Sequence, residues 1–117
     1  MKVMSIFGTR PEIIRLSRIF SLLDTNFEHV MVNTSQNYTK ELNSVFFDDL
    51  NIRKPDYDLK VNTEAYGIEV ADVIVKTEKL LKKEKPDVLL ILGDTNSGLS
   101  AIPAAHQVIK IAHLEAG

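Results

Sequence analysis

Residues 3–18 read VMSIF-GTRPE-IIRLSR. The apolar run predicts a strand, Gly8 predicts a turn, and the apolar residues that follow at helical spacing predict a helix with Pro11 in its first turn. The turn then lies at the carboxyl end of the strand, where the first N–H groups of a helix are unpaired and its dipole is positive. Arg10 and Arg15 add full positive charge, so the segment indicates a phosphate-binding turn.

A purely structural role for the same residues remains open at this point. Gly8 can serve only the tight turn, Pro11 only the start of the helix, and the two arginines only a solvated face. The segment matches neither the dinucleotide fingerprint nor a P-loop. Whether the turn binds an anion therefore depends on what the ends of the other predicted strands carry.

The composition is that of an ordinary soluble protein with one domain, 1–117. The chain has 117 residues, of which 44% are hydrophobic and 26% are charged. A net charge of −2 argues against a protein that binds nucleic acid or an anionic membrane. Because cysteine is absent, disulfides, thiolate metal sites and a cysteine nucleophile are excluded. The first apolar run is too short for a signal peptide or a membrane span, so we expect a cytoplasmic protein.

Strands and helices are expected to alternate along the chain. The first helix should bury Ile13, Leu16, Phe20 and Leu23, and a longer one should bury Val70, Ile74, Thr77 and Leu81. Pro103 should kink the last helix if it lies in the interior. Besides 3–7, the predicted strands are 28–34, 58–61, 87–92 and 108–112, and the later helices are about 39–50, 63–85 and 97–107.

This alternation predicts an α/β fold, with a Rossmann-like parallel sheet and helices on both of its faces. The strand at 87–92 is apolar throughout and should be buried on both sides. In such sheets ligands bind beyond the carboxyl ends of the strands. Four polar segments stand there, and they place an anion-binding turn and two carboxylates on one edge: Gly8-Thr9-Arg10, Gln36-Asn37-Tyr38, Gly93-Asp94-Thr95 and His113-Leu114-Glu115.

Asp94 and Glu115 are the residues best suited to chemistry. Asp94 either caps the following helix or points at a ligand. Glu115 lies two residues after His113, so strand alternation predicts that their side chains share a face. His113 itself suits a structural or orienting role better than that of a base. Two acids beside a phosphate-binding turn suit proton transfer at a sugar ring, because one can be protonated while the other is ionised.

The other polar candidates carry less chemistry. Gln36 and Tyr38 either contact a ligand or close their loop. His29 reads as a strand-edge residue and His106 as a helix-surface residue. Since no acid or second histidine stands at ligand spacing from either, we predict no metal site and no cofactor.

Three motifs in order, Gly8-Thr9-Arg10-Pro11-Glu12, Gly93-Asp94-Thr95 and His113-Leu114-Glu115-Ala116-Gly117, make the whole chain resemble the non-hydrolysing UDP-N-acetylglucosamine 2-epimerases. Members of that family have two Rossmann-like domains arranged as in the GT-B glycosyltransferases. The resemblance implies that residues 1–117 form the amino-terminal domain and that the carboxyl-terminal domain is absent from this chain.

The resemblance also implies an activity. In that family UDP is eliminated from the sugar nucleotide to leave a glycal, and it re-adds after the C2 proton has been exchanged to the other face. Asp94 and Glu115 would then be the catalytic acid/base residues, while Arg10 and Arg15 would hold the substrate and its diphosphate. Many members have lysine at position 15. The other substrate-binding positions implied are Gly8, Thr9, Gln36 and His113.

One branch of the family is closer than the others. The segments 12–18, 36–38, 41–43 and 94–97 resemble the enzymes that make UDP-N-acetyl-L-fucosamine for capsule or O-antigen. That branch usually has glycine before Gln-Asn-Tyr, where this chain has Ser35. The expected partners are a UDP-sugar and a second copy of the chain in a homodimer.

A non-catalytic interpretation competes with this one. The chain ends at the site it should help to build, and chemistry that needs both walls of a cleft should not run on half of it. We therefore expect the 117 residues alone to be inactive. The alternative is a truncated or split domain that binds a partner chain or an anion, and a glycosyltransferase of the same architecture fits the three motifs less well.

Overall fold

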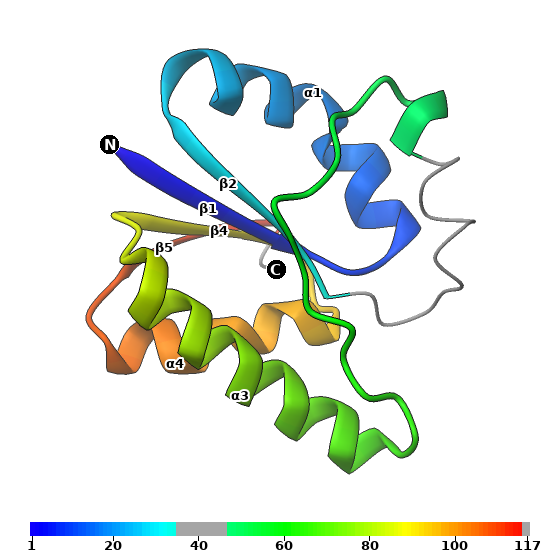
Figure 1. Cartoon of the computed structure of the whole chain (residues 1–117), viewed down its shortest axis with the longest axis vertical. Helices are drawn as coiled ribbons and strands as arrows, with labels where there is room; N and C mark the ends of the chain where they lie inside the picture. Colours follow the sequence, from blue (N-terminus) through cyan, green and yellow to red (C-terminus); the bar gives the residue numbers. More distant parts are fainter. Residues whose placement is uncertain (35–46, 116–117) are drawn as a thin grey trace.

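The computed structural model describes residues 1–34 and 47–115. Within these ranges the strands form one parallel sheet in the order β3-β2-β1-β4-β5 (Figure 1). The strands are β1 (Lys2–Phe7), β2 (Glu28–Asn33), β3 (Tyr57–Asp58), β4 (Val88–Leu92) and β5 (Lys110–Leu114). The helices are α1 (Arg10–Asn26), α3 (Tyr66–Glu84) and α4 (Ala101–His106), with the 3-10 helix η1 (Asn96–Ser100) before α4. The predicted α/β parallel sheet is confirmed.

Helices cover both faces of the sheet, as predicted. Helix α1 lies on one face and helices α3 and α4 lie on the other (Figure 1). Strand β4 shows why both faces are apolar: Leu90 and Leu92 pack on the side of α1, whereas Leu89 and Ile91 pack on the opposite side. Because successive side chains of a strand point to opposite faces, a continuous apolar run is what a doubly covered strand requires.

Helix α1 packs as its sequence predicts. Ile13, Leu16 and Phe20 are buried against the sheet, and Leu23 is partly buried beside them. The ring of Phe20 contacts that of Phe7, with 5.1 Å between the ring centroids. This packing fixes the start of α1 close to the carboxyl end of β1.

The predictions for the middle of the chain need correction. Helix α3 begins at Tyr66 rather than near residue 63, and its fully buried residues are Val73, Thr77, Leu80 and Leu81. Val70 and Ile74 are only partly buried, so the buried stripe is rotated from the predicted one. The strand predicted at 58–61 is the two-residue strand Tyr57–Asp58. The helix predicted at 39–50 lies mostly outside the described residues.

The carboxyl-terminal elements also differ from prediction. The helix predicted at 97–107 is divided into η1 and α4, and Pro103, the third residue of α4, has no N–H to donate to the carbonyl of Leu99. The last strand begins at Lys110 rather than Val108. Val108 has a φ of 60°, its N–H donates to Ala105 O, and Ile109 N–H donates to Ala104 O. This is a Schellman turn that ends α4, so the strand starts two residues later than predicted.

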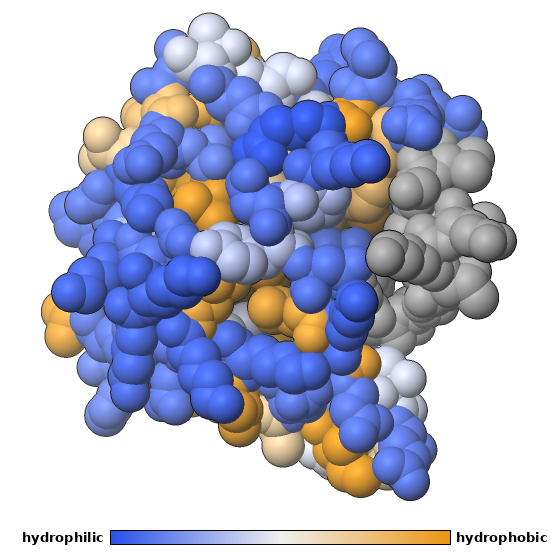
Figure 2. Space-filling view, in the orientation of Figure 1, coloured by the Kyte–Doolittle hydropathy of each residue, from blue (hydrophilic) through white to orange (hydrophobic). Residues whose placement is uncertain are grey.

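The surface seen in Figure 2 is mainly hydrophilic, and its apolar residues lie in small separate patches. Within the described residues, no helix combines the length and the apolar character needed to cross a membrane.

Candidate active site

The carboxyl edge of the sheet has its switch point between β1 and β4. After β1 the chain enters α1 on one face, and after β4 it enters η1 and α4 on the other face. The two connections therefore diverge from neighbouring strands and leave room for a ligand between them. The sequence placed Gly8-Thr9-Arg10 and Gly93-Asp94-Thr95 at two strand ends, and the structure brings these two turns to the same switch point.

Glu12 joins these two turns. Its side chain is only 2% exposed. Its Oε2 accepts hydrogen bonds from the N–H of Gly8 (2.7 Å), the N–H of Thr9 (2.8 Å) and the hydroxyl of Thr9 (3.0 Å). Its Oε1 accepts hydrogen bonds from the hydroxyls of Thr95 (2.5 Å) and Ser97. One buried carboxylate thus binds groups from both connections.

This contact changes the interpretation of the β1–α1 turn. The sequence suggested that unpaired N–H groups there would bind phosphate, but the N–H groups of Gly8 and Thr9 are already paired with Glu12. The sequence contained a signal for this pairing. Thr9 and Glu12 stand at the spacing of a capping box, in which a glutamate at the third helical position bonds back to the N-cap. Arg10 and Arg15 follow this turn on α1 and place positive charge beside it.

Asp94 is exposed and follows Gly93 directly. Gly93 has a φ of 68°, a backbone conformation that glycine adopts without strain. Within residues 1–34 and 47–115, no hydrogen bond or ion pair engages the carboxylate of Asp94. The N-cap of η1 is Thr95, so the alternative role of Asp94 as a cap is not the one observed. Its carboxylate is therefore available to a ligand.

Glu115 forms an ion pair with Arg15 of α1, with 3.1 Å between Nη1 and Oε2. The two residues are 100 positions apart in the sequence, and their side chains are 59% and 55% exposed. The pair spans from the first half of α1 to the end of β5. It is a solvent-accessible contact, so a ligand anion can compete for the guanidinium of Arg15.

His113 and Glu115 do not share a face, which corrects the prediction from strand alternation. His113 lies in register with Ile91, whose side chain packs on the side of α3 and α4. Glu115 follows the end of β5, has a φ of 54°, and bonds to α1 on the other side of the sheet. The left-handed backbone of Glu115 breaks the alternation.

His113 has a positioning contact instead. Its Nε2 lies 2.5 Å from the carbonyl oxygen of Gly93, and the N–H of Gly93 donates to Leu114 O at 2.8 Å. These two contacts attach the turn that carries Asp94 to the end of β5. Gln36, with Asn37 and Tyr38, lies outside the described residues. Arg10 is the first residue of α1 and is partly buried.

A family model described as UDP-N-acetylglucosamine 2-epimerase matches residues 22–117. The chain belongs to this family. Three relatives illustrate the similarity. The solved UDP-N-acetylglucosamine 2-epimerase of Rickettsia bellii is 51% identical with a TM-score of 0.91, and the alignment covers 100% of this chain and 31% of that one. The Methanocaldococcus jannaschii enzyme, solved with UDP-GlcNAc and UDP, is 39% identical with a TM-score of 0.92 over 100% of this chain and 33% of that one.

The third relative is named for another sugar. It is the UDP-2,3-diacetamido-2,3-dideoxy-D-glucuronate 2-epimerase of Pseudomonas aeruginosa, 34% identical over 100% of this chain and 34% of the relative. This chain therefore spans about one third of the length of the relatives it matches.

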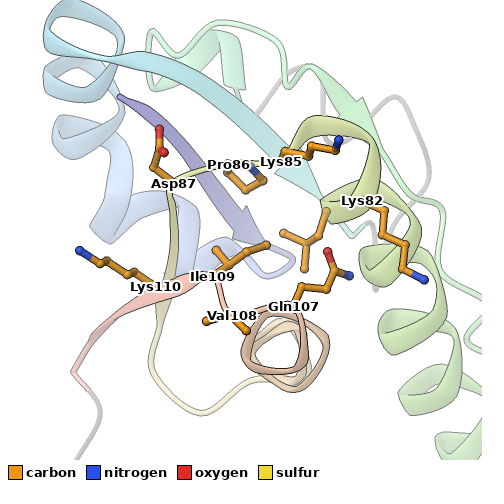
Figure 3. A pocket seen from close by; sticks show the side chains of 9 residues that line it. Lys82, Lys85, Pro86, Asp87, Gln107, Val108, Ile109 and Lys110 are labelled. Atoms are coloured by element: carbon orange, nitrogen blue, oxygen red, sulfur yellow. The ribbon is translucent and has the colours of Figure 1, made fainter.

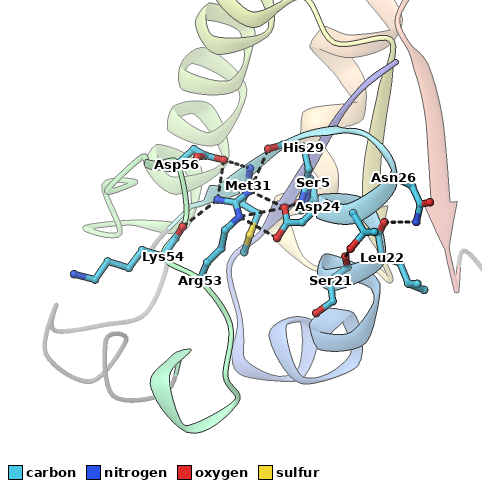
Figure 4. Close-up of polar contacts among 11 residues, drawn as sticks. Ser5, Ser21, Leu22, Asp24, Asn26, His29, Met31, Arg53, Lys54 and Asp56 are labelled. Atoms are coloured by element: carbon cyan, nitrogen blue, oxygen red, sulfur yellow. Dashed lines mark hydrogen bonds and ion pairs between the residues drawn. The ribbon is translucent and has the colours of Figure 1, made fainter.

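A second polar network surrounds His29 (Figure 4). His29 Nδ1 lies 2.8 Å from Asp24 Oδ1, and its Nε2 lies 2.8 Å from the hydroxyl oxygen of Ser5. The order acid, histidine, serine is that of a hydrolase triad, but Ser5 is fully buried in β1 and cannot reach a substrate. The network is structural. The sequence has no acid at ligand spacing from His29, and the structure brings Asp24 of α1 to it.

Burial lowers the pKa of His29, although Asp24 opposes that shift. Burial by itself would raise the pKa of Asp24, but hydrogen bonds from Arg53 and His29 and the charge of Arg53 hold it below its ordinary value. Arg53 also pairs with Asp56 at 3.1 Å. In the described part of the chain, no group of three or more potential ligands is arranged to hold a metal ion.

A pocket of about 560 Å³ lies away from the candidate active site (Figure 3). Its lining includes Pro86 and Asp87, which precede β4, and Val108, Ile109 and Lys110 at the start of β5. These residues stand at the amino ends of the strands, so this pocket is on the opposite edge from Asp94 and Glu115. The candidate active site at the switch point is therefore separate from this pocket.

Proposed function

We propose that this chain provides one wall of a site that inverts C2 of a UDP-2-acetamido sugar by elimination and re-addition of UDP. The observation that carries the proposal is the arrangement at the switch point. Two exposed carboxylates, Asp94 and Glu115, follow the adjacent strands β4 and β5, and the guanidinium of Arg15 contacts Glu115. Family membership supports the same chemistry.

In this mechanism a carboxylate removes the proton from C2 while the C1–O bond to UDP breaks, which leaves a C1–C2 double bond. An oxygen of UDP then attacks C1 again, and an acid delivers a proton to the other face of C2. We assign these two transfers to Asp94 and Glu115. The exposed carboxylate of Asp94 is open to a substrate, and Arg15 holds Glu115 while contributing positive charge beside it.

The remaining site residues bind and orient. Arg10 and Arg15 attract the diphosphate, because the backbone N–H groups of Gly8 and Thr9 are taken by Glu12. Gly8 and Thr9 shape the turn that carries Arg10, and His113 orients the turn that carries Asp94. We include Gln36 among the substrate-binding residues because the family resemblance implies it.

The wider setting belongs to the same proposal. We assign the chain to a two-domain GT-B-like epimerase that acts as a homodimer in the cytoplasm and supplies a sugar nucleotide for capsule or O-antigen. The family resemblance of the three motifs supports the two domains and the homodimer. The segments 12–18, 36–38, 41–43 and 94–97 support the polysaccharide, and the short first apolar run supports the cytoplasm. Relatives named for different UDP-sugars leave the acetamido sugar to be chosen by experiment, with UDP-N-acetylglucosamine tested first.

The decisive experiment is proton exchange at C2. The protein made from its natural gene is incubated with UDP-N-acetylglucosamine in deuterium oxide, and deuterium at C2 is measured by NMR. We expect Asp94→Asn and Glu115→Gln each to lower turnover by at least about 100-fold, with thermal unfolding unchanged. Glu28→Gln, an exposed carboxylate at the amino end of β2, is the matched control and should keep its activity. Retained turnover in both site variants would refute the assignment.

A second function, binding without catalysis, is favoured by the surface at β5. Ile111 is 37% exposed and Val108 is 89% exposed, and in the described residues β5 pairs only with β4. An open strand edge can pair with another chain. This alternative predicts that UDP or a partner chain binds while no deuterium enters C2, which calorimetry and size-exclusion chromatography would detect.

A further inference from the structure

The carboxylate of Glu12 is the only strongly buried acid that the proposed chemistry leaves unused among the described residues. It accepts five hydrogen bonds from four residues. Two come from backbone N–H groups at the start of α1, and two come from hydroxyls that lie 83 and 85 residues further along the chain. A helix cap needs only the first group of partners. The second group needs a different explanation.

The position of these hydroxyls supplies one. Thr95 follows Asp94 directly, and Ser97 is buried in η1. On the other side, Gly8 and Thr9 lead directly into Arg10. The two connections leave the neighbouring strands β1 and β4 toward opposite faces of the sheet. The hydrogen bonds between these strands therefore do not fix the distance between the two turns. Glu12 spans that separation with one carboxylate.

We propose that Glu12 is a positioning residue that locks the β1–α1 turn to the β4–η1 turn and so fixes Asp94 relative to Arg10 and Arg15. This inference rests on the proposed function for its kinetic consequences only. The carboxylate also supplies the negative charge that the positive end of α1 favours, so the substrate diphosphate binds the arginine side chains rather than the N–H groups of Gly8 and Thr9. Glu12 does not touch the substrate in this arrangement.

The first test distinguishes a bridge by Glu12 between the two turns from a simple helix cap by Glu12. The double substitution Thr95→Val with Ser97→Ala removes the hydroxyls and leaves the bonds to Gly8 and Thr9 intact. We expect kcat to fall by about 10-fold to 100-fold while KM changes by less than about threefold, since small displacements of reacting groups mainly affect the chemical step. Ser100→Ala is the matched control, because it removes a buried hydroxyl of η1 that bonds to Ser97 O and not to Glu12. A kcat for the double variant equal to that of the control would refute the bridge.

The second test does not depend on activity. Amide hydrogen exchange is measured by NMR in Glu12→Gln and in the double variant. A bridge predicts reciprocal effects: Glu12→Gln accelerates exchange at Gly98, whose N–H bonds to Thr95 O, and the double variant accelerates exchange at Thr9. Exchange altered only in the turn that carries the substitution would overturn the proposal. If the protein made from its natural gene shows no turnover, the proposed function fails, while this exchange pattern still decides the role of Glu12.

Discussion

The two ends of helix α1 each carry a carboxylate in a hydrogen-bond network, but the partners differ. Glu12, in the first turn, accepts hydrogen bonds from backbone N–H groups and hydroxyls. Asp24, in the last turn, is paired with Arg53 and His29. A helix dipole is positive at its N-terminus and negative at its C-terminus. Negative charge is therefore stabilised by the helix itself at Glu12, whereas at Asp24 it needs an arginine from another segment.

This difference separates two tasks along one helix. The Glu12 network consists of backbone N–H groups and hydroxyls, and it lies at the switch point, where it contacts both turns of the candidate active site. The Asp24 network connects α1 to β2 and to residues 53–56 near the amino end of β2. Salt and acid should weaken the Asp24 network more than the Glu12 network. Salt acts on the Asp24 network because it screens ion pairs near the surface.

The largest effect on stability is expected from Glu12→Ala. This change leaves buried N–H groups and hydroxyls without an acceptor, and we expect the free energy of unfolding to fall by about 3–5 kcal/mol. Urea denaturation followed by circular dichroism measures it. Asp24→Ala is the comparison at the other end of the helix, and a greater loss from Asp24→Ala would contradict the ranking of the two networks.

The next largest effect is expected from Arg53→Ala. Its guanidinium bonds to Asp24, Asp56 and the carbonyl of His29, but it is 36% exposed, so the loss should be about 1–2 kcal/mol. Arg53→Lys keeps the charge without the planar fork and should recover only part of it. Denaturation at low and high salt checks the charge contribution. A loss that does not depend on salt would mean that packing, and not charge, dominates there.

A smaller effect is expected from acid acting on His29. Its pKa is lowered in the folded state by burial, so the unfolded chain binds the proton first as the pH falls. Stability should therefore decline as the pH falls from the ordinary histidine value near 6.5 toward the lower pKa of folded His29. The lowered pKa of Asp24 predicts a further decline in stability near and below the ordinary aspartate value of 3.8. Unfolding of His29→Gln across this range should lack the first decline, and an unchanged profile would assign it to another group.

The smallest effect on stability is expected from Arg15→Ala. The ion pair with Glu115 is more than half exposed at both partners, so its loss should change the free energy of unfolding by less than about 0.5 kcal/mol. If the proposed function is correct, Arg15→Ala should lose most of its turnover while it keeps nearly all of its stability. Thermal unfolding and the C2 exchange assay on the same sample separate the two effects.

Most of the fold could be predicted because burial dominates it. Val88–Leu92 and the stripe Ile13, Leu16 and Phe20 carry patterns that only a covered sheet and its helix explain. The errors arose where local backbone geometry decides. A Schellman turn with valine in the left-handed position delays β5 by two residues, and the left-handed conformation of Glu115 sends its side chain away from His113. Apolar patterns contain no information about such dihedral angles.

The candidate site was predicted in its parts but not in its connections. The strand ends supplied Arg10, Asp94 and Glu115, and Arg15 follows about one helical turn after Arg10. The contact between Arg15 and Glu115 could not be predicted from residues 100 positions apart. The partners of Glu12 on the β1 side were readable from the Thr-x-x-Glu capping box. Its partners on the β4 side depend on which strands become neighbours, and they emerge only from the sheet order.

The long sequence separation in the Glu12 network has a consequence for how the chain folds. The N–H partners of Glu12 are local and can form with the first turn of α1, but the hydroxyls of Thr95 and Ser97 reach it only after β4 has docked beside β1. Parallel pairing across so many residues is slow because the loop must close first. The Glu12 network is therefore completed late, and a chain emerging from the ribosome holds Glu12 half-paired until β4, Thr95 and Ser97 have been made.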